Sequence, residues 1–232
     1  MGTTYLDLCN KVLRHFNEAV LTNSTLSTAT GFHSVVKDAV NHSIQRIHQA
    51  EPEWPFNFSS TNQTLNASNY LYSFPSDAER IDFDTFWLNR DDALTVSAKN
   101  LRQIDYDDFV QRYKGNLLNA TNGSVYIPEF VFRTQNLQWG VGPYIPDRAY
   151  SVSYEYWAQQ SDLTAGTNAT VIPSRFDRVI TDGAISTCYA FRGDGGRTGN
   201  YDRLQREGIN SMRMLLIDKT TNFRDGRVGR AG

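Results

Sequence analysis

Five aspartates that lie close together in the sequence are the residues most able to do chemistry: Asp77, Asp82, Asp84, Asp91 and Asp92. Carboxylates grouped in this way can ligate a hard cation or act as the acid and base of a glycosidase. However, Asp82 and Asp84 alternate with Ile81 and Phe83, a pattern typical of a strand with one face in solvent. We therefore expect a solvated strand face here, and a hydrolase built on these carboxylates is the weaker alternative.

Nucleophilic or metal chemistry would need histidines or cysteines in suitable arrangements. The four histidines all fall on the first two predicted helices: His15, His33, His42 and His48. They fall between or beside the apolar positions, so we expect histidines at the surface or at the rim of the helices. Cys9 and Cys188 lie on apolar helix faces, which favours packed thiols over a disulfide or a zinc site. Since the sequence also has no Gly-x-Ser-x-Gly or His-Glu-x-x-His motif, it predicts no catalytic residue, metal ligand or cofactor.

The glycine-rich segment Gly193–Gly199 is a further place where a ligand, in this case a phosphate, could bind. It follows a predicted helix rather than a strand, and it has Arg197-Thr198 where a P-loop needs Lys followed by Ser or Thr. We expect a tight turn between two helices instead.

Aromatic residues are abundant and include Trp54, Phe56, Trp87, Trp139 and Trp157. Most aromatics in a small β-domain fill its core or a subunit interface, and this is our first interpretation. The alternative is a carbohydrate- or receptor-binding module in which Trp87, Trp139 or Trp157 stacks on a sugar.

The composition is that of a soluble globular protein. The chain has 232 residues, of which 40% are hydrophobic and 21% charged, and its net charge of -2 does not favour a general polyanion binder. No apolar run approaches the roughly 18 residues that span a bilayer, so we expect no membrane partner. The first residues include Thr3, Thr4 and Asp7 rather than a basic segment and an apolar core, which argues against a signal peptide.

Helical spacing of apolar residues occurs near both ends of the sequence. Residues 31–50 have the longest stripe, which has Ser27 and Thr28 upstream as possible N-caps and Pro52 beyond its end. Residues 4–18 form another helix, with Thr4 and Asp7 resembling a capping box, and the polar connector 22–30 joins the two. Two more helices are predicted from Pro173 to about 191 and over 201–219, and Gly183 and Ala184 allow another helix to approach closely.

Between these helices the spacing changes to that of short strands. Alternating or aromatic segments separated by turn residues occur at 54–65, 69–74, 81–88, 94–98, 129–134, 137–141 and 150–158. In the last of them, Tyr150, Val152, Tyr154 and Tyr156 share one face. One helix is predicted at 105–113, followed by an exposed loop at 114–124.

We therefore predict an α+β fold in which the two ends of the chain form a four-helix bundle and an antiparallel β-domain, a sheet or a small sandwich, is inserted between them. The expected domains are residues 1–53 with 173–221 for the bundle and 54–172 for the β-domain. Residues 222–232 form an extended tail, in which arginines recur every third residue: Arg224, Arg227 and Arg230. Such a tail is either solvated or becomes ordered on a partner that supplies carboxylates or phosphates.

Three segments together resemble a known family. They are Tyr5–Leu13, Thr30–Ile44 and Trp54-Pro-Phe-Asn57, and the later motifs Tyr72–Ser76, Phe130-Val-Phe-Arg133 and Trp139-Gly140 agree with them. The chain is similar over nearly its whole length to the head-to-tail adaptors, or tail tubular proteins A, of short-tailed bacteriophages.

The resemblance implies a non-enzymatic structural protein of the virion tail, located at the head–tail junction and assembled in the host cytoplasm. About twelve copies form a ring beneath the portal protein, and DNA passes through the ring without sequence-specific binding. The expected partners are the portal, the nozzle (tail tubular protein B) and the tail fibres. By the same analogy, Phe223, Arg224, Arg227 and Arg230 dock on the portal.

Overall fold

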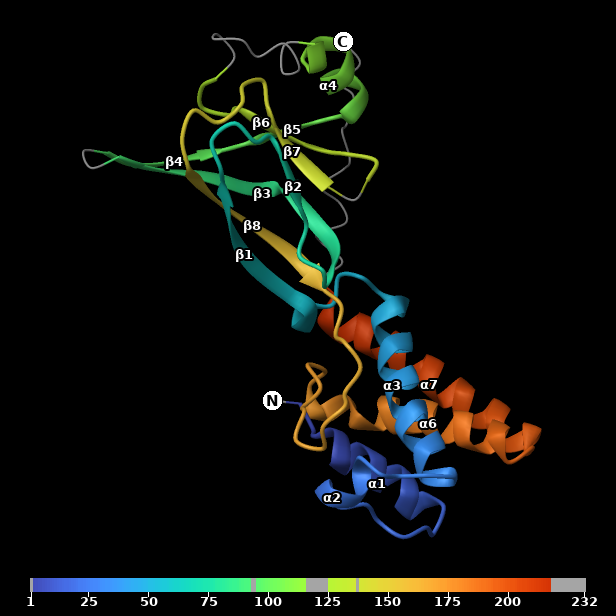
Figure 1. Cartoon of the computed structure of the whole chain (residues 1–232). Coiled ribbons are helices and arrows are strands. Elements are labelled where there is room, and N and C mark those ends of the chain that lie inside the picture. The colour runs from blue at the N-terminus through green and yellow to red at the C-terminus, as the bar shows by residue number, and fades with distance from the viewer. Residues whose placement is uncertain (1, 93–94, 116–124, 137, 218–232) are drawn as a thin grey trace, which may run out of the picture. The chain divides into compact units, whose positions relative to one another are not determined.

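The computed structural model describes residues 2–92, 95–115, 125–136 and 138–217, with the side chains of residues 90–97 also left out (Figure 1). These residues form two compact units, one made of residues 2–57 together with 159–217 and the other of the described residues within Phe58–Ala158. The first is helical and is built from both ends of the chain. The second contains both β-sheets. The chain thus has an α+β fold, as the sequence predicted.

Three helices lie in the N-terminal part of the helical unit: α1 (Tyr5–His15), α2 (Asn23–Leu26) and α3 (Phe32–Ala50). Thr4 caps α1 by accepting a hydrogen bond from the Asp7 backbone N–H, and its hydroxyl donates to the Asp7 carboxylate. The prediction that Ser27 or Thr28 caps α3 was wrong, because Gly31 occupies that position and its φ of 59° suits a residue without a Cβ. The polar connector also contains the short helix α2, whose N-cap, Thr22, makes a capping box with Thr25.

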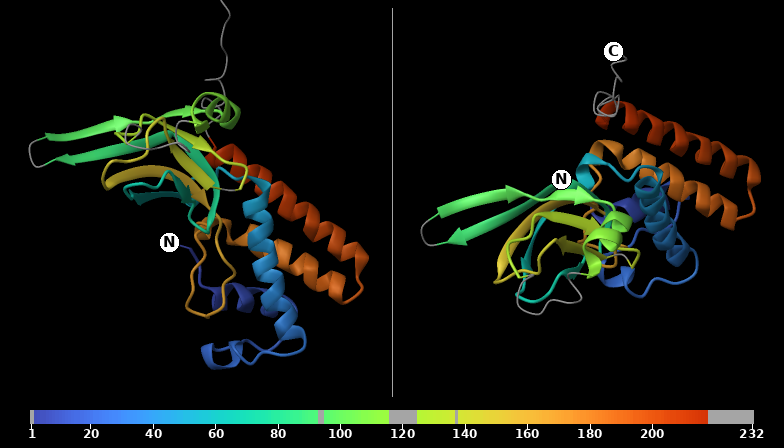
Figure 2. Two further views of the ribbon diagram at one scale, coloured as in Figure 1. Left: turned by 45° about the horizontal axis from the view of Figure 1, so that its top comes forward. Right: turned by 90° about the horizontal axis from the view of Figure 1, so that it is seen from above.

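The C-terminal helices α6 (Asp177–Phe191) and α7 (Gly195–Leu216) follow a 3-10 turn, η2 (Ser174–Phe176), and form an antiparallel hairpin (Figure 2). Two bonds of a Schellman motif end α6, from the Gly193 N–H to the Ala190 carbonyl and from the Asp194 N–H to the Tyr189 carbonyl. Gly193 has the φ of +78° that this motif requires. The side chain of Asp194 then caps α7, so the turn is shorter than predicted and α7 begins six residues before Tyr201.

The helices of this unit share one apolar core. Helix α6 packs against α1, α3 and α7, and it presents Ile180, Ala184 and Cys188 to them. Helix α3 crosses the α6–α7 hairpin obliquely in Figures 1 and 2 rather than running along it. The structure therefore does not confirm a four-helix bundle. Trp54 also lies in this core, as do Leu163 and Ile172 from the segment that precedes η2.

The second unit contains two four-stranded sheets, of order β1-β8-β3-β4 and β2-β7-β6-β5. The strands of the first sheet are β1 (Phe58–Leu65), β3 (Ala78–Asp92), β4 (Thr95–Asn100) and β8 (Tyr150–Ala158), and those of the second are β2 (Leu71–Ser73), β5 (Arg102–Ile104), β6 (Phe130–Arg133) and β7 (Gln138–Gly142). All pairs are antiparallel except β5 with β6, which are parallel. The antiparallel prediction was wrong for this pair, because β5 is a three-residue strand that the sequence pattern did not indicate.

The two sheets pack face to face around aromatic side chains. Trp139 of β7 is fully buried and contacts Phe86 of β3 and Tyr154 of β8. As predicted, Tyr150, Val152, Tyr154 and Tyr156 bury one face of β8. Helix α4 (Tyr106–Arg112) covers the second sheet by stacking Phe109 on Phe132 of β6.

Candidate functional site

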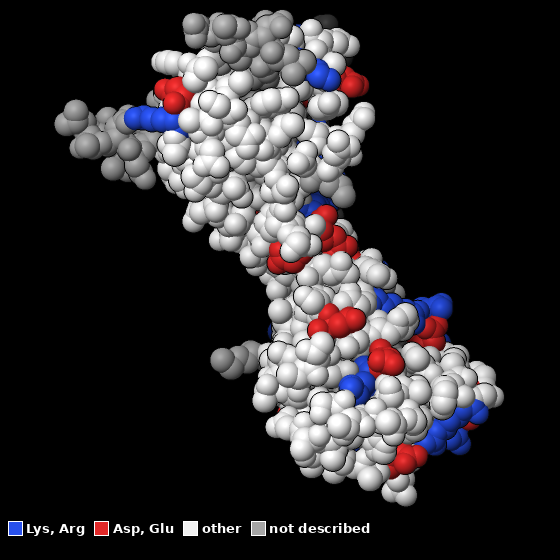
Figure 3. Space-filling model, viewed as in Figure 1, with Lys and Arg blue, Asp and Glu red and all other residues white. Residues whose placement is uncertain are grey.

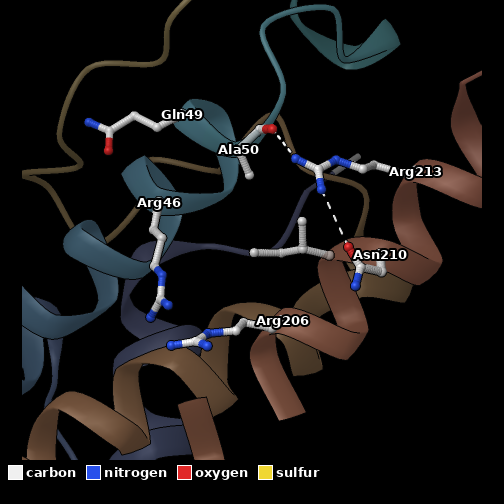
Figure 4. Close-up of a pocket in the computed structure, with 7 residues that line it drawn as sticks. Arg46, Gln49, Ala50, Arg206, Asn210 and Arg213 are labelled. Carbon is white, nitrogen blue, oxygen red and sulfur yellow. Dashed lines mark hydrogen bonds between the residues drawn. The ribbon is translucent and has the colours of Figure 1, made fainter. Parts of the chain in front are cut away.

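A groove of about 440 Å³ between α3 and α7 brings three arginines together (Figure 4). Helix α3 supplies Arg46, Gln49 and Ala50, and α7 supplies Arg206, Ile209, Asn210 and Arg213. The α7 residues fall at three- and four-residue steps, so they occupy one side of the helix next to its buried stripe. The groove is therefore a consequence of helical spacing and of how closely the two helices pack.

Asp202 joins two of these arginines. Its Oδ1 lies 2.6 Å from Arg46 Nη1 and its Oδ2 lies 2.5 Å from Arg206 Nη2. Asp202 and Arg206 are one turn apart on α7, whereas Arg46 comes from the other helix. The carboxylate thus holds the two guanidinium groups on the same side of the groove.

Arg213 has a different role, because it binds the end of α3. Its guanidinium donates to the carbonyl of Ala50, the last residue of α3, and its Nε lies 3.6 Å from a carboxylate oxygen of Glu51. It also donates to the Asn210 side chain over 3.3 Å. A cation at a helix C-terminus satisfies a free carbonyl and is stabilised by the helix dipole.

A buried polar network lies beneath the groove and connects three helices. The Ser43 hydroxyl donates to the Ile180 carbonyl over 2.7 Å, and the Gln205 amide donates to the Ser43 oxygen over 2.9 Å. Arg46 completes the network by donating to the Gln205 carbonyl oxygen over 3.0 Å. Gly183 of α6 leaves room for the Gln205 amide, so the expected close approach of a helix at Gly183 is confirmed.

The groove has more positive than negative groups. Three guanidinium groups line it, and two carboxylates, those of Asp202 and Glu51, pair with them. Arg206 is the most exposed of the three arginines, with 68% of its side chain accessible. On the face drawn in Figure 3, basic side chains lie in several groups over the helical unit, with acidic ones beside them.

The aspartates that could have served a hydrolase instead make local hydrogen bonds or point to solvent. The Asp82 carboxylate accepts a hydrogen bond from the Asp84 backbone N–H where the pairing of β3 with β8 shifts register, and Asp84 points to solvent. Asp77 accepts a hydrogen bond from Tyr156. The side chains of Asp91 and Asp92 lie outside the described residues. Within the part of the chain that the structure describes, no group of three His, Cys, Asp or Glu could hold a metal ion.

One histidine contradicts the prediction of surface or rim positions. His48 is fully buried, and its Nδ1 accepts a hydrogen bond from the Asn57 amide over 2.8 Å. Desolvation by burial lowers its pKa to about 4, against smaller opposing effects of hydrogen bonds with Gln160 and Asn57. The helical spacing of apolar residues does not include this position, because His48 packs beside Phe56, which follows the end of the helix.

Both cysteines are free and buried, as predicted. Burial raises the pKa of the Cys9 thiol and of the Cys188 thiol to about 12 in each case. The three tryptophans considered for sugar stacking differ in how far they are exposed. Trp139 lies in the β-sandwich core and cannot stack on a sugar, Trp157 is half-buried beside Phe58, and Trp87 is 46% exposed.

The four residues predicted to dock on a portal, Phe223, Arg224, Arg227 and Arg230, lie outside the described residues. The arginine groove was not predicted from the sequence, since Arg46 and Arg206 belong to helices far apart in the chain. The one signal that could have indicated it is the spacing of Asp202, Arg206 and Arg213 along α7. None of the helices that the structure describes combines the length and the apolar character needed to cross a membrane.

The fold and the groove define an α+β protein in which a β-sandwich is inserted into a helical unit with a charged, arginine-rich flank. The model of the SU10 adaptor protein family matches residues 3–229, nearly the whole chain, and the chain belongs to this family of phage head-to-tail adaptors. This confirms the resemblance that the sequence motifs suggested. No curated protein matches the chain.

Proposed function

We propose that the protein is a ring subunit that joins the portal of a bacteriophage to the nozzle and fibres of its tail. The observation that supports this is the match of the adaptor family over residues 3–229, because it spans both the helical unit and the β-sandwich. A phage structural protein of this family is a component of the virion tail. The protein acts there by binding other proteins, without catalysis, and it is assembled in the host cytoplasm.

In the proposed assembly, about twelve copies enclose the channel through which DNA leaves the head. The net charge of -2 suits this role, since a weakly negative wall does not retain a moving duplex. The helical unit and the C-terminal tail meet the portal, with Phe223, Arg224, Arg227 and Arg230 in contact with it. The β-sandwich faces the nozzle and the fibres.

The mass of the particle tests the proposal directly. Native mass spectrometry of the purified protein, alone and mixed with portal rings, should show a stable complex that contains both proteins. A chain that never associates with portal rings would refute the adaptor function.

A truncation tests the docking tail separately. A chain that ends after Thr221 should keep its fold and lose attachment to portal-containing heads, because it lacks the aromatic residue and the three arginines beyond it. The matched control is the full chain with Phe223 retained and Arg224, Arg227 and Arg230 replaced by glutamine, which isolates the contribution of charge. Full attachment of the truncated chain would show that residues 222–232 do not dock.

A further inference from the structure

The arginine groove between α3 and α7 has capacity for one more carboxylate. Arg206 and Arg46 share Asp202, and Arg213 is engaged with Ala50 and Glu51. Among the described residues, the Arg206 guanidinium has no other ion pair than Asp202, although it has five N–H donors. A carboxylate from another molecule could therefore accept hydrogen bonds from the remaining N–H donors of the Arg206 guanidinium.

The surface beside Arg206 has the composition of a protein-binding site. Met214 lies two turns along α7 on the neighbouring side and is 73% exposed, and the apolar side chain of Ile209 forms part of the groove. Arginine and methionine are enriched at protein interfaces. A DNA site is disfavoured, because Asp202 and Glu51 pair with the arginines of the groove and leave it only weakly positive.

The opposite charge is found on another flank of the same helical unit. Asp38 of α3 and Asp162 of the segment after β8 are both exposed carboxylates. Gln45 Nε2 of α3 donates a hydrogen bond to the Asp162 carboxylate over 3.2 Å, and Asp38 lies two turns before Gln45 on the same side of this helix, so both carboxylates border one side of α3. The arginine groove lies instead on the α7 side of α3.

We infer that the α3–α7 groove of one copy binds the Asp38 and Asp162 carboxylates of a second copy. A head-to-tail interface joins two different surfaces of the same chain, and repeated contacts of this kind close into a ring when the rotation permits. The helical unit has the arginine groove on one side of α3 and the exposed carboxylates of Asp38 and Asp162 on another side. The inference rests on the proposed adaptor function, since a ring subunit must bind its own copies.

Charge reversal in the full-length protein tests the contact. Sedimentation velocity over a concentration series should show that Arg206→Glu weakens self-association at least about tenfold, because it places like charges at the interface. Asp38→Lys should weaken it similarly, and the chain with both substitutions should recover most of the wild-type association. High salt should weaken the wild-type association as well.

The matched control is Arg178→Glu. Arg178 is an exposed α6 residue that pairs with Asp182 one turn away, as Arg206 pairs with Asp202, but it does not line the groove. This variant should associate like the wild type.

The inference would be overturned by a wild-type chain that stays monomeric, or by Arg178→Glu and Arg206→Glu weakening self-association equally. It would also be overturned if the double variant did not regain self-association. A last contradicting result is an Arg206→Glu protein that loses binding to duplex DNA but associates with itself like the wild type. Portal binding of the same samples separates the two proposals. If a monomeric wild-type chain still binds portal rings, the groove contact is refuted and the adaptor function stands.

Discussion

Replacing Gly183 by alanine tests how the helical unit is packed. A Cβ atom at this position would lie 2.1 Å from Gln205 Nε2, 2.4 Å from Gln205 Cδ and 2.5 Å from Ser43 Oγ. Gln205 is fully buried and cannot withdraw without breaking its hydrogen bonds with Ser43 and Arg46. The substitution therefore crowds the contact between α6 and α7 and also breaks a buried hydrogen bond.

The magnitude follows from three opposing contributions. Alanine is favoured over glycine inside a helix by about 1 kcal/mol. Overpacking of a core costs about 1–3 kcal/mol, and a buried polar group left without its partner costs about 1–3 kcal/mol. We expect Gly183→Ala to lower the free energy of unfolding by about 2 kcal/mol or more. Helix propensity alone would instead make the variant more stable than the wild type.

Urea denaturation followed by circular dichroism at helical wavelengths measures the effect. The control is Gly199→Ala in α7, where an added Cβ would meet nothing within 4 Å, and this variant should be more stable than the wild type by up to about 1 kcal/mol. Adding Gln205→Ala should reduce the cost of Gly183→Ala, because the clashing amide is removed. A Gly183→Ala protein as stable as the wild type would refute the proposed packing.

Three further predictions follow from burial. The His48 side chain has a pKa of about 4 in the folded protein and of about 6.5 in the unfolded chain, so the unfolded chain binds a proton first as the pH falls. The free energy of unfolding should therefore fall by about 2 kcal/mol between pH 7 and pH 5. Urea denaturation at a series of pH values should show this fall in the wild type and not in His48→Gln. Cys9 and Cys188 should not react with a thiol reagent at pH 8 in the native protein but both should react in denaturant, since burial raises the pKa of each to about 12. Trp139→Ala should cost about 3–5 kcal/mol of unfolding free energy and Trp87→Ala less than about 0.5 kcal/mol, with equal costs contradicting the sandwich core.

The elements with strong periodicity could be predicted well from the sequence. The predicted helix at 31–50 is α3 at Phe32–Ala50, and the predicted strand at 150–158 is β8 at Tyr150–Ala158. In both elements a continuous apolar face is buried against neighbouring elements, so the spacing of the apolar residues in the sequence indicates which face is buried. The short strand β5 has no such spacing, because three residues with only Ile104 half-buried carry no periodic signal.

The buried side of helix α7 was predicted only in part. The apolar spacing of the helix predicts one buried side made of Tyr201, Leu204, Gly208, Met212, Leu215 and Leu216. The structure buries Met212 and packs Tyr201 and Leu216 against the core, but it also buries Gln205 and Ile209 and leaves Leu215 exposed. A polar residue at the centre of a buried stripe lowers the apparent periodicity. Its partners, Ser43 and Arg46, are on a helix about 160 residues earlier, so the sequence alone gives no reason to bury it.

The buried position of Gln205 also explains why the arginine groove was not predicted from the sequence. Gln205 fixes the rotation of α7 by its hydrogen bonds to α3, and this rotation turns Asp202 and Arg206 toward Arg46. The packing at Gly183 and the charge pattern of the groove are therefore one structural feature. A Gly183→Ala protein that keeps its fold but shifts α7 should lose self-association together with stability, whereas Gly199→Ala should keep both.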